Sequence, residues 1–106
     1  MRIKQPSARE KTQLQESVLE RDNHACIECG RYTMETHHIV SRGIAGAWHE
    51  KNMLTLCRFC HRLNGHGAHV KKVFYIRYLA DTFGYDYSDM PEAWLSLARE
   101  AGLIDA

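Results

Sequence analysis

The chain has 106 residues, of which 44% are hydrophobic and 25% charged, with a formal net charge of +1. These proportions exclude a disordered or low-complexity chain. The length leaves room for one small domain, whose modest core would gain stability from an additional cross-link. The first six residues lack the apolar run of a signal peptide and no later stretch reaches the length of a membrane span, so we expect a cytoplasmic protein without membrane association.

The N-terminal segment is predicted to be a helix from about Ser7 to Arg21. The sequence Ser7-Ala8-Arg9-Glu10 has the form of a capping box, in which the serine and glutamate side chains each bond the other's backbone N–H. A thin apolar stripe follows at helical spacing. Its members are Leu14, Val18 and Leu19.

Two short strands are expected next. Residues 33–40 contain the Thr, Ile and Val typical of a strand, and they carry His37 and His38. Residues 41–51 include two glycines and are predicted to be a loop, and residues 53–56 a second strand that leads into Cys57. We expect the two strands to pair as a hairpin.

The C-terminal half is predicted to be helical. A helix should begin at Arg58, be interrupted at Gly65 and Gly67, and continue to Gly84 with an apolar side of Val70, Val73, Phe74 and Tyr78.

A polar turn is predicted over residues 85–89, followed by a last helix. Ser88 or Asp89 can cap this helix, with Pro91 in its first turn and Gly102 ending it. Its apolar side would be Trp94, Leu95, Leu97 and Ala98. We expect Trp94, together with Tyr75 and Tyr78, to belong to a core that docks these helices onto the rest of the domain.

Four cysteines form two Cys-x-x-Cys pairs, and they are the strongest signal in the sequence. Each pair has the spacing of a turn in which two thiolates grip one zinc ion, and two pairs complete a closed tetrahedral site. The alternative, two redox-active pairs, normally accompanies a βαβ pattern that is absent here. We therefore predict one structural zinc bound by Cys26, Cys29, Cys57 and Cys60.

Charge is distributed unevenly along the chain. Residues 1–72 hold 12 Lys and Arg against 7 Asp and Glu, whereas residues 73–106 hold 2 against 6. Residues 37–72 carry most of the excess, which favours a polyanionic partner, and the acidic half should face away from it. The candidate phosphate contacts are Arg42, Arg58, Arg62, Lys71 and Lys72.

The cysteine pairs bracket His37-His38-Ile39-Val40 and Asn52, and His61 follows directly after the second pair. In this combination, residues 21–67 resemble the zinc-containing HNH endonucleases, many of which are small phage or prophage proteins. The resemblance implies a ββα-metal (His-Me finger) core and hydrolysis of a nucleic-acid phosphodiester with help from a divalent metal.

The resemblance also assigns roles to individual residues. His38 matches the general base that activates water, and His37 and His61 match ligands of the catalytic metal. Asn52 matches the central asparagine, whose amide would position the loop that orients His38. The family often has Asp where this chain has His37, so the metal, Mg²⁺, Mn²⁺, Ni²⁺ or Zn²⁺, is left open. Because strand neighbours face opposite sides, the strand is expected to end or bulge at the histidine pair.

The sequence thus predicts one α+β domain over residues 1–106, with a core at about 21–67 and a helical extension at about 68–106. We expect it to nick DNA as a monomer. Two alternatives remain: a catalytically silent zinc module that binds nucleic acid or protein, and a subunit of a larger machine such as phage DNA packaging.

Overall fold

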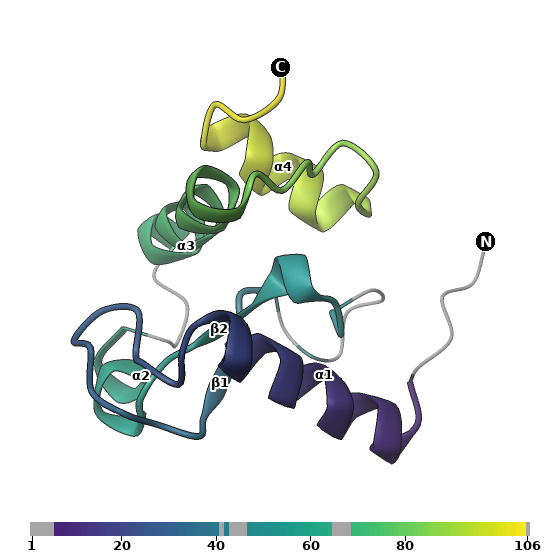
Figure 1. Ribbon diagram of the computed structural model, residues 1–106. Coiled ribbons are helices and arrows are strands. Elements are labelled where there is room, and N and C mark those ends of the chain that lie inside the picture. The colour runs from purple at the N-terminus through teal and green to yellow at the C-terminus, as the bar shows by residue number, and fades with distance from the viewer. Residues whose placement is uncertain (1–5, 41, 43–46, 65–68, 106) are drawn as a thin grey trace.

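The computed structural model describes residues 6–40, 42, 47–64 and 69–105, without the side chains of residues 62–64 and 69–70. Its elements are α1 (Ala8–Arg21), β1 (Thr36–His38), the 3-10 turn η1 (Glu50–Asn52), β2 (Met53–Thr55), α2 (Arg58–Asn64), α3 (His69–Phe83) and α4 (Glu92–Glu100). The hairpin lies between α1 on one side and the α3–α4 pair on the other (Figure 1). The predicted α+β class, with a hairpin followed by a helix, is confirmed.

Helix α1 begins as the capping box predicts. The Ser7 hydroxyl accepts a bond from the Glu10 N–H at 3.1 Å, and the Glu10 carboxylate accepts one from the Ser7 N–H at 2.9 Å. Two backbone N–H groups that a helix start leaves unpaired are thereby satisfied. Val18 and Leu19 are buried, so the predicted apolar side of the helix faces the hairpin.

The strands pair antiparallel, with His37 opposite Leu54 and His38 opposite Met53. Both are shorter than predicted, because the residues before β1 serve the cysteine turns. Tyr32 bridges to Ala25, and the Glu35 carbonyl accepts the Leu56 N–H at 3.2 Å. The predicted loop over 41–51 ends in η1, while residues 41 and 43–46 lie outside the described part of the chain.

Helices α2 and α3 occupy the predicted region, and Gly65 and Gly67, the predicted interruption, lie outside the described residues. The predicted apolar side of α3 is wrong at Phe74, which is 50% exposed, while Ile76 and Leu79 enter the core beside Tyr75, whose burial was expected. The side chain of Val70 lies outside the described residues. Helical spacing alone does not decide between adjacent apolar stripes when one helix carries apolar residues on most of its circumference.

The predicted cap of α4 is also wrong. Pro91 is the N-cap residue, and it has no side-chain hydrogen bond to offer. The Asp89 carboxylate instead accepts a bond from the Lys51 Nζ at 3.1 Å. At the other end, the helix stops at Ala101 and Gly102, whose φ of +75° is the left-handed conformation that glycine adopts most easily.

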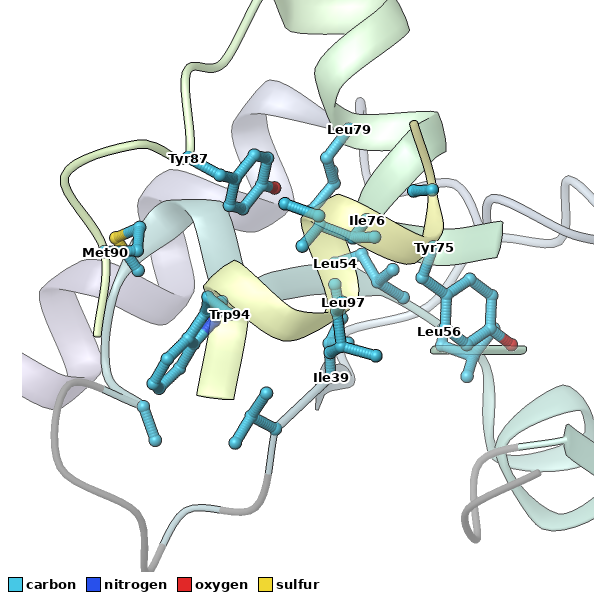
Figure 2. Close-up of a cluster of buried hydrophobic side chains, with 14 of the residues drawn as sticks. Ile39, Leu54, Leu56, Tyr75, Ile76, Leu79, Tyr87, Met90, Trp94 and Leu97 are labelled. Carbon is cyan, nitrogen blue, oxygen red and sulfur yellow. The ribbon is translucent and has the colours of Figure 1, made fainter. Parts of the chain in front are cut away.

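The core lies between the hairpin and the C-terminal helices. Figure 2 shows Ile39, Leu54 and Leu56 from the hairpin region meeting Ile76 and Leu79 of α3 and Trp94 and Leu97 of α4. Tyr87, from the predicted polar turn, is also buried, and its hydroxyl donates to the Lys51 carbonyl at 2.6 Å. The C-terminal extension is therefore part of the same core as the hairpin.

A guanidinium–carboxylate pair fixes the end of α1. Arg21 bonds both oxygens of Asp22, at 2.9 and 3.0 Å, and donates to the Met53 carbonyl at 2.7 Å. The same guanidinium lies 4.7 Å from the centre of the Phe83 ring at the end of α3. The second Asp22 oxygen accepts the Thr55 N–H at 2.9 Å. The pair thus joins α1, β2 and α3.

Removal of the Asp22 carboxylate should destabilise the protein strongly. The Asp22 side chain is 1% exposed and that of Arg21 13%, so Asp22→Ala leaves a largely buried cation without its counter-ion and the Thr55 N–H without its acceptor. We expect a loss of about 3 kcal/mol in the free energy of unfolding, measured by urea titration of the zinc-loaded protein. The control is Asp81→Ala, which breaks the exposed Arg77–Asp81 pair and should cost at most about 0.5 kcal/mol. Equal losses would contradict the role given to Asp22.

Candidate metal centre and histidine cluster

The four cysteines converge as the sequence predicts. Their sulfur atoms all lie within 4.8 Å of one another, and the Sγ atoms of Cys29 and Cys57 are 3.7 Å apart. Tetrahedral zinc with Zn–S bonds of about 2.3 Å requires sulfurs about 3.8 Å apart. The donor set and its spacing therefore fit zinc, and four thiolates leave no open position on it.

Local backbone geometry shapes the two turns. In the first turn, the Gly30 N–H bonds the Cys26 carbonyl at 2.9 Å, and Gly30 has a φ of +78°, which few other residues adopt. In the second turn, the Cys60 N–H points at the Cys57 sulfur at 3.4 Å. Backbone N–H groups aimed at sulfur stabilise a thiolate, the form that binds metal.

The thiol pKa values reflect the crowding of the four sulfurs. Burial raises the pKa of Cys60, and the neighbouring thiols Cys57, Cys26 and Cys29 raise it further. Burial also acts to raise the pKa of Cys26, but hydrogen bonds from the backbone of Cys57, Cys29 and Glu28 outweigh it and bring the pKa to about 7. Four thiolates in this space repel one another unless a cation lies between them, which is a second reason why the cluster suits a divalent ion.

Two of the predicted site histidines meet beside the cluster. His37 comes from β1 and His61 from the first turn of α2, and their ring centres are 4.7 Å apart at an interplanar angle of 61°. His37 is 8% exposed, and its ring also packs against the Tyr75 ring of α3, with centres 5.8 Å apart. The antiparallel register and the second cysteine turn together bring these two imidazoles to one place.

His38 occupies the position at which β1 ends. Its ring packs against the Trp48 ring, with centres 4.5 Å apart at 73°. In the described part of the chain, its Nε2 atom is buried without a hydrogen-bond partner. Burial, followed by the positive charges of Arg42 and Lys11, lowers the pKa of His38 to about 4. The imidazole is therefore neutral near pH 7, the form that can accept a proton.

Asn52 is completely buried and uses both ends of its amide. Its nitrogen donates to the carbonyls of Val40 and Ala47, at 3.0 and 2.8 Å. Its oxygen accepts the Val40 N–H at 2.8 Å and the indole N–H of Trp94 at 2.9 Å. The side chain thereby fixes the backbone two residues after His38. The bond from Trp94 was not predicted, although a buried indole N–H requires an acceptor.

The predicted phosphate contacts differ in their surroundings. Lys71 is paired with Glu28 at 2.7 Å, and Arg58 lies 3.6 Å from Glu35. Among the described residues, Arg42 and Lys72 make no ion pair, and the side chain of Arg62 lies outside them. Two of the five predicted cations are thus partly neutralised within the protein.

Comparison with known proteins agrees with this arrangement. The family model described as HNH endonuclease matches residues 26–67. This match and the four-cysteine cluster are consistent with the zinc-binding HNH family. The match begins at Cys26 and extends past His61, so it contains both cysteine turns, the hairpin and α2. Searches among curated proteins and solved structures gave no match.

The HNH segment accounts for the predicted ββα-metal core, which is formed by β1, β2 and α2 with the four-cysteine cluster beside them. Helices α1, α3 and α4 lie outside the matched residues, yet Trp94 of α4 binds Asn52 within them. Among the described residues, no helix is long and apolar enough to cross a membrane.

Zinc content should depend on every cysteine but not on Phe59, one of the two residues between Cys57 and Cys60. Cys60→Ser replaces a soft thiolate ligand, and we expect it to lose the zinc and much of the helical signal in circular dichroism. Phe59→Ser lies in the same turn at a side chain that is 61% exposed, so it should keep about one zinc per chain. Atomic absorption after gel filtration measures the zinc content of both variants. Full zinc in Cys60→Ser would contradict a four-cysteine site.

Loss of the bonds donated by the Asn52 amide nitrogen should lower the stability of the protein more than loss of one bond to the amide oxygen. Trp94→Phe removes one donor, but the Asn52 oxygen keeps the Val40 N–H, so we expect a loss of about 1 to 2 kcal/mol. Asn52→Asp places a carboxylate against the carbonyls of Val40 and Ala47, and we expect more than about 3 kcal/mol. Urea titration compares the two. An Asn52→Asp variant as stable as Trp94→Phe would show that the amide donor bonds contribute little.

Proposed function

We propose that this chain is a metal-dependent endonuclease that hydrolyses phosphodiester bonds in DNA. The observation that carries the proposal is the meeting of the His37 and His61 rings, with centres 4.7 Å apart. His38 directly follows His37 in sequence, and Asn52 fixes the backbone at Val40. Nitrogen ligands, a neutral imidazole and a rigid scaffold are what such hydrolysis requires of a protein.

His37 and His61 would hold the catalytic divalent ion. Two imidazoles suit Mn²⁺, Ni²⁺ or Zn²⁺ better than Mg²⁺, which prefers oxygen ligands. When bound, the ion would neutralise charge on the phosphate and help the leaving oxygen depart. The zinc of the cysteine cluster would take no part in the chemistry, because its four ligands close it.

The protein residues would divide the remaining work. His38 would take a proton from the attacking water, and its neutral state near pH 7 leaves a nitrogen free to do so. Asn52 would act indirectly, by holding the backbone after His38 through its bonds to Val40. Tyr75 would hold the His37 ring, against which it packs.

We include Arg42, Lys72 and Arg62 as phosphate contacts, with Arg58 and Lys71 available only where their ion pairs open.

The expected product is a nick with 5′-phosphate and 3′-hydroxyl ends, because one such site acts on one strand. Cleavage of both strands would need two chains or two successive events. We expect the protein to act in the cytoplasm. Service as a subunit of a phage DNA-packaging machine remains compatible with this chemistry and would appear as weak activity that a packaging partner restores.

The test is the conversion of supercoiled plasmid to nicked and linear forms with Mg²⁺, Mn²⁺, Ni²⁺ or Zn²⁺, with EDTA as the blank. We expect metal-dependent nicking that falls by at least about a hundredfold in His38→Ala, the usual contribution of general base catalysis. Zinc content and circular dichroism establish that the variant is folded.

The matched control is His49→Asn. The His49 Nδ1 atom accepts the Lys51 N–H at the start of η1, and asparagine keeps an acceptor for this cap. This variant should therefore nick at the natural rate. Equal nicking by the natural protein and His38→Ala would remove His38 from the mechanism. DNA binding without turnover under any metal would favour a silent zinc module.

A further inference from the structure

A lysine from outside the HNH segment lies close to the proposed general base. The Lys11 Nζ of α1 lies 4.9 Å from the centre of the Trp48 ring, and the same ring packs against His38. A tryptophan face attracts a cation through its ring electrons. Trp48 therefore holds the lysine ammonium on one side and contacts the His38 imidazole with the same ring system.

The position of Lys11 on α1 is unusual for a lysine. It precedes Leu14 by three residues and Val18 by seven, so it lies on the face of the helix that turns toward the hairpin. Lys11 is half-buried, whereas Arg9, two residues earlier on the opposite side, is exposed. A cation on a half-buried side chain is stabilised by an opposite charge, a polar partner or an aromatic ring face.

Within the described ranges, no carboxylate forms an ion pair with Lys11. Among the described residues, the ion pairs engage Arg21, Lys51, Arg58, Lys71, Arg77 and Arg99. Lys11 makes none of these pairs, and Arg42, four residues after His38, makes none either. The surroundings of His38 therefore carry an excess of positive charge within the described part of the chain.

We propose that Lys11, held on Trp48, is a phosphate-binding residue that receives a backbone phosphate of the DNA strand next to the cleaved bond. The inference rests on the proposed function and extends its site beyond residues 26–67. An ammonium group offers three donors and no acceptor, and the backbone of DNA carries a negative charge at every nucleotide. Such a contact would set the register of the strand over His38 without reading the base sequence.

The experiment measures DNA binding and nicking in parallel for Lys11→Met, Lys11→Arg and Arg9→Met. Binding of a fluorescent duplex is followed by anisotropy at several salt concentrations, without added divalent metal, and a gel verifies that the duplex remains intact. Arg9→Met is the matched control, because it removes one positive charge from the same helix on the side away from Trp48. Circular dichroism and zinc content establish that the variants are folded.

For Lys11→Met we expect the slope of log affinity against log salt to fall by about 1, and the affinity at 0.1 M salt to fall about fivefold to tenfold. Lys11→Arg, which keeps the charge and can still stack on Trp48, should restore the slope. Arg9→Met should keep the slope and change affinity less than about twofold.

The inference is overturned if Lys11→Met and Arg9→Met behave alike, or if the natural protein does not bind the duplex. Nicking by the natural protein distinguishes failure of the Lys11 phosphate contact from failure of the nuclease assignment. If it nicks but the two variants bind and nick equally, the nuclease assignment stands and Lys11 has only a structural role. If it never nicks but the salt slope depends on Lys11, the phosphate contact stands and the nuclease assignment falls.

Trp48→Leu tests, through a double-mutant cycle, whether the Trp48 ring positions the Lys11 ammonium. If the indole positions the ammonium, Trp48→Leu should weaken binding, and its combination with Lys11→Met should weaken it no further than Lys11→Met alone. Additive losses would mean that the two side chains act separately, which contradicts a joint subsite.

Discussion

The buried amide of Asn52 is the contact on which the arrangement of the site depends. Its four hydrogen bonds reach the backbone after His38, the backbone at Ala47 and the indole of Trp94. A hydrogen bond in a dry core is strong, and a missing partner there is costly, so the three segments are held at fixed separations. The short strands alone, with three residues each, would hold Val40 and Ala47 less firmly.

Two other constraints act at the ends of this arrangement. The four sulfurs fix the first cysteine turn against the start of α2, and this sets where His61 lies relative to His37. The Arg21–Asp22 pair fixes the end of α1 against β2 and the end of α3. The backbone around the histidines is therefore fixed by the Asn52 amide, the four sulfurs and the Arg21–Asp22 pair. Such rigidity is what precise placement of reacting groups requires.

Local and short-range signals were enough to predict much of this structure. The capping box predicted the start of α1, and the cysteine spacing predicted the cluster, because each signal is a geometric property of a few neighbouring residues. The pairing of His37 with His61 followed from the family resemblance.

Contacts that depend on packing could not be predicted. The Asn52–Trp94 bond joins residues 42 positions apart, and it exists only because α4 docks on the hairpin. The same holds for Lys11 and Trp48, and for Phe74, which turned outward when its neighbours Tyr75 and Ile76 took the core.

The indole of Trp94 has a consequence for modularity. Residues 26–67 hold the four cysteines together with His37, His38 and His61 in one continuous stretch of sequence. This segment depends on residues outside it: Trp94 of α4 donates a hydrogen bond to Asn52, and apolar side chains of α3 pack against the hairpin. Residues 26–67 and the C-terminal helices are thus one structural unit, so a substitution at Trp94 would disturb Asn52 although it lies outside that segment.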